Sequence, residues 1–175
     1  MNGAAPAWPL LQGDLAGEGI GLRRVTEADL DFLRALYAAG RAEEMARVGW
    51  TPEMASSFLA DQFMLQHRHF TAHYADADDF IVMAHGAAVG RLLLDRRAAP
   101  WRLVELALTG PMQGRGWGSA LLRWLQREAR IQGPGELDLN VALDNPRAEA
   151  LYRRLGFQDV AHSSATHRRM IWTVS

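Results

Sequence analysis

The chain of 175 residues contains no cysteine, so disulfide bonds and catalysis by a thiolate are both excluded. It has no apolar run long enough to cross a bilayer, and we expect no membrane association. Lysine and arginine (19) nearly balance aspartate and glutamate (20), which gives a net charge of −1. Such a chain has no strongly basic surface for nucleic acid. We therefore expect a protein that binds neither nucleic acid nor membranes, and the lack of cysteine favours the cytoplasm.

What the sequence does contain is typical of one globular domain. Apolar residues make up 49% of the chain and charged residues 22%, which are ordinary proportions for such a domain. The first 18 residues hold several glycines and prolines and show no clear period. We expect residues 1–18 to form a loose arm and residues 19–175 to form a single domain.

Hydrophobic periodicity and turn residues predict the order β-α-α-β-β-β-α-β-α-β-β, a mixed sheet with helices packed on it. The sequence patterns place six of these strands, at 20–25, 79–84, 88–95, 102–108, 137–141 and within 167–175. The strands 79–84 and 88–95 flank His85-Gly86 and are predicted to form a hairpin. The predicted helices are 30–40, one that begins at Pro52, 116–132 and 146–155. In the helix from Pro52, we place Met54, Phe58 and Leu65 on one side. Thr26 and Asp29 have the spacing of a capping box, and Asn145 is placed to cap the last helix.

The segment "PMQGRGWGSALL" (111–122) places alternate glycines directly before a helix. The first turn of a helix has unpaired N–H groups and a partial positive charge, which suit a phosphate. Gly114, Gly116 and Gly118 have no Cβ that would hold an anion away from those amides, and Arg115 adds a positive charge. The pattern predicts a site for a cofactor that carries a pyrophosphate.

Several interpretations of this loop compete. A dinucleotide-binding motif needs a third glycine where Ser119 stands, and it follows the first strand of its fold rather than the fourth. A P-loop needs a Gly-Lys pair that is absent. The pattern Q-x-x-G-x-G fits, with Gln113, Gly116 and Gly118. A tight turn without a ligand is the remaining interpretation, but three alternate glycines cost backbone entropy that such a turn does not need.

Together with a second segment, the loop resembles the GCN5-related N-acetyltransferase (GNAT) family. "ELALTGPMQGRGWGSALL" (105–122) is similar to that family's acetyl-CoA-binding segment, and "LNVALDNPRAEALYRRLGF" (139–157) is similar to the segment that follows it. One departure is that Gly110 stands where many members have proline. The resemblance spans residues 20–174 and implies the GNAT fold, an α/β (α+β) fold. It has a central mixed, mostly antiparallel sheet of six to seven strands flanked by about four helices.

The resemblance also implies an enzyme that transfers an acetyl group from acetyl-CoA to a primary amine by direct attack in a ternary complex. It implies that the main chain of a strand edge pairs with the pantetheine arm at Leu106, Ala107 and Leu108. It implies that the pyrophosphate binds at Gln113, Gly114, Arg115, Gly116, Trp117, Gly118 and Ser119. Asn145 and Tyr152 complete the implied cofactor-binding set, in which Asn145 contacts or orients the pantetheine.

Two side chains are candidates for proton transfer. Tyr152 matches the family tyrosine near the thioester sulfur and is the candidate donor to the leaving thiolate, although spacing alone also suits a buried helix stripe. Glu105 lies within an apolar strand, where a carboxylate is unusual. We place Leu103, Glu105 and Ala107 on one face of that strand. Glu105 is then either a base or an amine-binding group in the acceptor cleft, or a surface carboxylate paired with Arg102 or Arg91.

Some questions stay open on the sequence alone. His69 and His73 have the spacing to share a helix face, but no cysteine or ligand pattern supports a metal site, and we predict none.

A non-catalytic acyl-CoA-binding protein and, less favoured, a dinucleotide-binding domain are the alternatives to an enzyme. The amine acceptor, a small molecule or a peptide, is not identified. The family often forms homodimers through its C-terminal strands, and "MIWTV" (170–174) is apolar enough for a shared edge.

Overall fold

The computed structural model describes residues 19–160 and 164–174, so the arm expected at 1–18 lies outside the described residues. The strands are β1 Ile20–Arg24, β2 Asp78–Ala84, β3 Ala87–Asp95, β4 Trp101–Leu108, β5 Glu136–Ala142, β6 Gln158–Asp159 and β7 His167–Thr173. The helices are α1 Leu30–Gly40, α2 Ala42–Val48, α3 Pro52–His73, α4 Trp117–Gln132 and α5 Pro146–Arg154. Two 3-10 turns, η2 Glu27–Asp29 and η3 Gly110–Met112, precede α1 and α4.

All seven strands form one sheet in the order β1-β2-β3-β4-β5-β7-β6. Only β4 and β5 pair in parallel, and the other neighbours pair antiparallel. The turn between β2 and β3 is formed by His85 and Gly86, both with positive φ. The predicted hairpin at this position is therefore confirmed, and so is a mixed, mostly antiparallel sheet.

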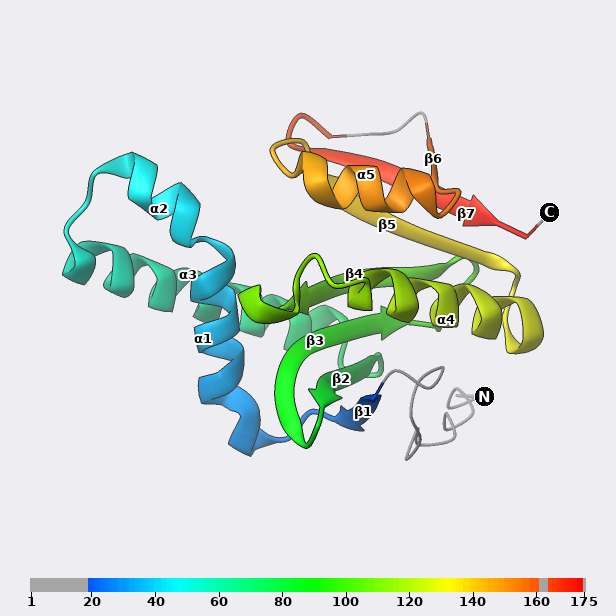
Figure 1. Ribbon diagram of the computed structural model, residues 1–175, viewed down its shortest axis with the longest axis horizontal. Coiled ribbons are helices and arrows are strands. Elements are labelled where there is room, and N and C mark those ends of the chain that lie inside the picture. Colours follow the sequence, from blue (N-terminus) through cyan, green and yellow to red (C-terminus); the bar gives the residue numbers. More distant parts are fainter. Residues whose placement is uncertain (1–18, 161–163, 175) are drawn as a thin grey trace.

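Helices cover both faces of the sheet (Figure 1). On one face, α4 buries an apolar stripe against β3, β4 and β5: Leu121, Leu122, Trp124, Leu125 and Ala129. On the other face, Leu33 of α1 and Phe63 of α3 pack on Ile81 of β2. The two faces therefore carry separate groups of side chains, and the strands between them present residues to each.

Local signals account for the helix ends. Asp29 and Thr26 form the predicted capping box before α1, and Arg23 donates a hydrogen bond to the Asp29 carboxylate at 2.8 Å. Thr51 caps α3 through its side chain, with Pro52 at the first helical position. These ends fall where the sequence predicted them.

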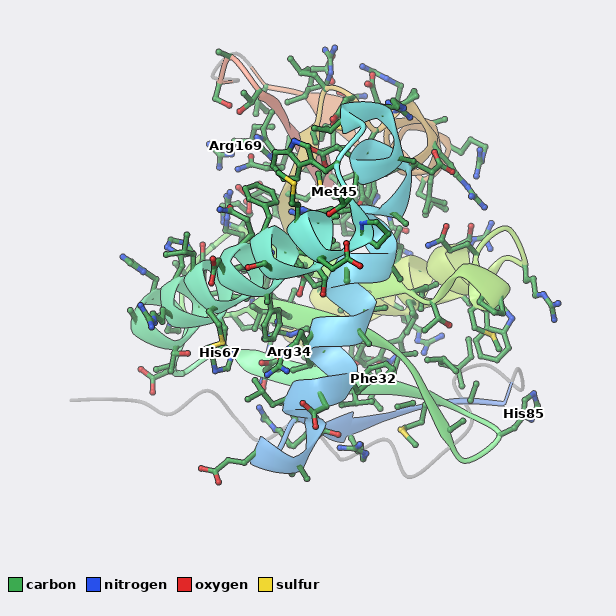
Figure 2. All side chains as sticks on the ribbon, turned by 90° about the vertical axis from the view of Figure 1, so that its left-hand side faces the viewer. Phe32, Arg34, Met45, His67, His85 and Arg169 are labelled. Carbon is green, nitrogen blue, oxygen red and sulfur yellow. The ribbon has the colours of Figure 1, made fainter. Side chains whose placement is uncertain are left out.

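The region from residue 42 to residue 73 differs from the sequence prediction. α2 was not predicted, and its one buried residue is Met45, which lies where α2 approaches α1 and α3 (Figure 2). On α3, the side chains grouped on one side, Met54, Phe58 and Leu65, are 37–56% exposed, and Leu59 and Phe63 are buried instead. The helix is long and only partly in contact with the sheet, so its apolar residues are not a guide to its buried face.

Candidate active site

The two central strands diverge at one end of the sheet. β4 and β5 pair only between Trp101–Leu103 and Leu137–Leu139, and they then separate (Figure 1). The main chain at Leu106, Ala107 and Leu108 pairs with β3 on one side. On its other side it has no strand partner within the described residues. This open edge can pair with an extended ligand as an added strand would.

α4 begins beside this open edge without a side chain that caps it. Its N-cap is Gly116, which has a φ of +88°. The N–H groups of the first turn have no carbonyl to donate to within the helix and lie at the positive end of its dipole. A Cβ added at Gly116 would meet nothing within 4 Å. The glycine is therefore required by the positive φ and not by packing, and it leaves the approach to the amides open.

Two polar side chains hold the loop before α4. Gln113 donates from Nε2 to the carbonyl oxygen of Leu108 at 2.8 Å, which ties the loop to the end of β4. Arg147 of α5 donates to Oε1 of Gln113 at 3.4 Å, and its Nη2 would lie 3.0 Å from a Cβ at Gly114. Gly114 itself has a φ of +76°. An arginine that the sequence did not single out thus adds a second positive charge, after Arg115, at this loop.

The other predicted loop residues lie at the surface of the same segment. Gln113, Gly114, Arg115 and Gly116 are exposed, and Trp117, Gly118 and Ser119 are partly buried. Amides, glycines and two arginines therefore gather at the end of the sheet where β4 and β5 separate. The donor set fits the diphosphate of a nucleotide cofactor.

The second segment named by the sequence, α5, starts at the same end of the sheet. Asn145 accepts a hydrogen bond from the N–H of Ala148 at 3.1 Å, so it is a helix cap, and this bond leaves its amide nitrogen free. Tyr152 packs with Phe157, with ring centroids 5.7 Å apart. Its hydroxyl makes no hydrogen bond with another described residue. Burial raises the pKa of Tyr152 to about 12, which keeps the hydroxyl protonated.

Glu105 lies on the opposite face of the sheet, in a buried charge network. Arg91 donates to the Asp79 carboxylate through two bonds of 2.9 and 2.6 Å and to Glu105 Oε2 at 3.2 Å. The Arg91 side chain is 4% exposed and that of Glu105 is 21% exposed. Desolvation raises the pKa of Glu105, and the charge of Arg91 opposes this shift. Glu105 thus pairs with Arg91, one of the two arginines that the sequence offered, whereas Arg102 pairs with Asp138. Glu105 also lines a cavity, and its role as a base or amine-binding group stays a prediction.

The predicted faces of β4 are wrong at one residue. Leu93 of β3 pairs with Glu105, but the next residue, Leu94, pairs with Leu103. The extra residue is Val104, so the strand bulges and the alternation shifts by one position. Leu103 therefore lies on the α4 side, opposite Glu105 rather than beside it.

A cavity of about 80 Å³ lies between α1, α3 and this face of the sheet. Leu33, Leu36 and Phe63 form its apolar walls. Its polar groups are Tyr37, Arg41, Gln66, Arg91 and Glu105. The guanidinium carbon of Arg41 lies 3.8 Å from the centroid of the Tyr37 ring, and that ring meets Phe63 edge to face. The cavity thus combines apolar walls with charged groups of both signs.

Sequence reasoning missed Tyr37, Arg41 and Gln66 as site residues. Tyr37 and Gln66 belong to α1 and α3, and Arg41 is the residue that follows α1. Helical periodicity gives no reason to expect a polar cavity there, and only the packing of α1 and α3 on the sheet brings these residues together. The histidines that invited a metal interpretation, His69 and His73, are exposed and stacked with ring centroids 4.4 Å apart. In the part of the chain that the structure describes, no group of three His, Cys, Asp or Glu side chains is placed to hold a metal.

A family model described as the acetyltransferase (GNAT) family matches residues 35–157. This range includes the open strand edge, the glycine loop and α5. The chain belongs to the GNAT acetyltransferase family. Acetyl-CoA is the cosubstrate of this family, so the cofactor prediction is confirmed, as is the predicted fold with its seven-stranded sheet. The fifth helix beyond the expected four is α2.

Solved structures share this GNAT fold. The PaiA N-acetyltransferase of Thermoplasma acidophilum, in complex with coenzyme A, is 18% identical with a TM-score of 0.66, over 89% of this chain and 99% of that one. An acetyltransferase from Thermus thermophilus is 22% identical with a TM-score of 0.63, over 89% and 97%. A spermidine N-acetyltransferase of Vibrio cholerae, in complex with CoA and spermine, is 21% identical with a TM-score of 0.57, over 89% and 95%.

No curated protein matches the chain in sequence. Among the described residues, no helix combines the length and apolar character needed to cross a membrane.

Proposed function

We propose that the protein is an N-acetyltransferase that moves an acetyl group from acetyl-CoA to a primary amine by direct attack in a ternary complex. The observation that carries this proposal is the uncapped start of α4 beside the open edge of β4. Residues 19–175 are proposed to work as one catalytic domain. The cytoplasmic location expected from the sequence stays a prediction.

Binding of the cosubstrate is assigned to three sets of groups. The main chain of Leu106, Ala107 and Leu108 pairs with the pantetheine arm. The pyrophosphate binds to the amides and charges of the loop, namely Gln113, Gly114, Arg115, Gly116, Trp117, Gly118 and Ser119. Asn145 keeps its amide nitrogen for the pantetheine while its oxygen caps α5.

The proposed chemistry assigns one proton transfer to each face of the sheet. Acetyl-CoA supplies an acetyl group activated as a thioester. Glu105 accepts the proton that the acceptor amine must lose, and its raised pKa brings it closer to that task than an ordinary carboxylate. Tyr152 Oη donates a proton to the departing sulfur, since burial keeps this hydroxyl protonated.

A thermal-shift series with acetyl-CoA, CoA and NAD tests the cosubstrate. A ligand at about 100 times its dissociation constant stabilises by about 2.7 kcal/mol, which raises the melting temperature by about 5–10 °C for a domain of this size. We expect that shift with both CoA species and none with NAD. Thiol release with a panel of amines then separates an enzyme from a non-catalytic acyl-CoA-binding protein, which would bind CoA and acetylate nothing.

The expected homodimer through the C-terminal strands also stays a prediction. β7 pairs with β5 along its length, and the short β6 covers Met170 and Ile171 on its other side. A shared edge would therefore have to form beyond β6 or displace it. Sedimentation of the protein at two concentrations measures the oligomeric state directly.

A further inference from the structure

The charges of the cavity beneath α1 indicate what kind of amine it takes. Two of its groups are guanidinium groups, Arg41 and Arg91, and one is a carboxylate, Glu105. Arg91 is already neutralised, because it makes two bonds to Asp79. The balance that remains is one free positive charge and one carboxylate that shares a single bond with Arg91.

Arg41 is the free charge. It is partly buried, and its side chain makes no hydrogen bond or ion pair with another described residue. Its guanidinium stacks on the ring of Tyr37 at 3.8 Å, which occupies one face of the group and leaves its N–H donors free in the plane. A guanidinium in this state is prepared to bind a carboxylate through two parallel hydrogen bonds.

Arg41 is not placed to serve the cosubstrate phosphates. It follows α1, which packs on the face of the sheet that carries Glu105 and Ala107. The glycine loop leads into α4, which packs on the other face. The free charge therefore belongs to the acceptor side of the proposed active site.

We propose that the acceptor is a primary amine that also carries a carboxylate, as an α-amino acid does, with Arg41 binding the carboxylate and Glu105 the amine. This inference rests on the proposed function and names its substrate class. A free guanidinium and a carboxylate in the same cavity match the two charges of a zwitterion. A polyamine, by contrast, would bring several positive charges to a cavity that holds two guanidinium groups and one carboxylate. The walls of Leu33, Leu36 and Phe63 favour an amino acid with an apolar side chain.

The test compares amino acids with the amines that lack only the carboxylate. Thiol release from acetyl-CoA is measured for two matched pairs, leucine against isopentylamine and phenylalanine against phenethylamine, and for spermidine. Each substrate is tested with the wild-type protein, Arg41→Gln and Arg41→Lys. Arg34→Gln is the matched control, because Arg34 is an exposed arginine of α1 whose ion pair with Asp31 lies at the surface. Melting temperatures with and without CoA are recorded for every variant.

We expect the wild type to have a higher kcat/KM for each amino acid than for the partner amine, the matching amine that lacks the carboxylate. Arg41→Gln should lower kcat/KM for amino acids on the order of 10- to 100-fold and leave the partner amines nearly unchanged. Arg41→Lys should restore part of the loss, and Arg34→Gln should change neither value.

The inference is overturned if spermidine or the amines without a carboxylate are the better substrates, or if Arg41→Gln lowers both classes alike. It is also overturned if no amino acid is acetylated while CoA still raises the melting temperature. CoA binding stands in all three of these outcomes. The transfer reaction also stands in the first two, because an amine is still acetylated. The absence of any CoA effect would instead remove the proposed function itself.

Discussion

Replacing Tyr152 with phenylalanine removes one hydroxyl group and leaves the ring and its packing on Phe157 in place. The hydroxyl is bonded to no other described residue, so its loss leaves no partner unsatisfied. We expect the free energy of unfolding to change by less than about 1 kcal/mol, a shift in melting temperature of at most about 2–4 °C. A large loss of activity would then have to come from chemistry rather than from unfolding.

The expected loss follows from the role assigned to the hydroxyl. With a pKa of about 12, only about one Tyr152 hydroxyl in ten thousand is ionised at pH 8, so the proton donor is present across the physiological range. General acid catalysis contributes about 10²–10⁴ in rate, which corresponds to roughly 2.7–5.4 kcal/mol in the activation barrier. Tyr152→Phe should therefore lower kcat by that factor, equally at pH 7 and pH 9.

The assay is thiol release in single-turnover conditions, which isolates transfer from product release. Tyr74→Phe is the matched control, since Tyr74 is the C-cap residue of α3 and, among the aromatic side chains that the structure describes, its ring contacts those of Phe70 and His69. A Tyr152→Phe protein that transfers the acetyl group within threefold of the wild-type rate would refute the donor role. A loss in rate matched by a fall in melting temperature would show that the hydroxyl is structural.

Three further predictions concern charge and space. Because desolvation raises the pKa of Glu105 above its ordinary 4.5, the acidic limb of kcat/KM against pH should lie above that value. Glu105→Gln should abolish the limb, and a limb that persists would exclude Glu105 as the base. Hydrogen bonds from Arg23 lower the pKa of Asp29, so its stabilisation is complete above about pH 4 and declines as the pH falls further. Asp29→Asn should accordingly lower the melting temperature at pH 7 more than at pH 2.5, and an equal loss at both would contradict this. Gly90→Ala would place a Cβ 2.4 Å from a backbone carbonyl oxygen of β4, which should cost about 1–3 kcal/mol; Gly40→Ala, with nothing within 4 Å of the added carbon, should leave the melting temperature nearly unchanged.

Features that depend on neighbours along the chain could be predicted from the sequence. The caps at Thr26 and Asn145, the hairpin around His85 and the glycine loop before α4 are each formed by residues a few positions apart. Their geometry follows from local sterics and hydrogen bonding, which the residue types already carry. The family and the cosubstrate could be identified for the same reason, because both follow from two short segments.

Features that depend on distant pairing were decided only by the tertiary structure. The bulge at Val104 arises from the register of β4 against β3, so no pattern within β4 alone could show that Leu103 faces away from Glu105. Arg91 and Arg41 reach the same cavity from β3 and from the end of α1, and their charge balance depends on Asp79. The sequence by itself determined where the cosubstrate is expected to bind, because one loop and one helix start make that site. The packing of α1 and α3 on the sheet decided which side chains meet at the acceptor side, because residues far apart in the chain become neighbours only when the molecule folds.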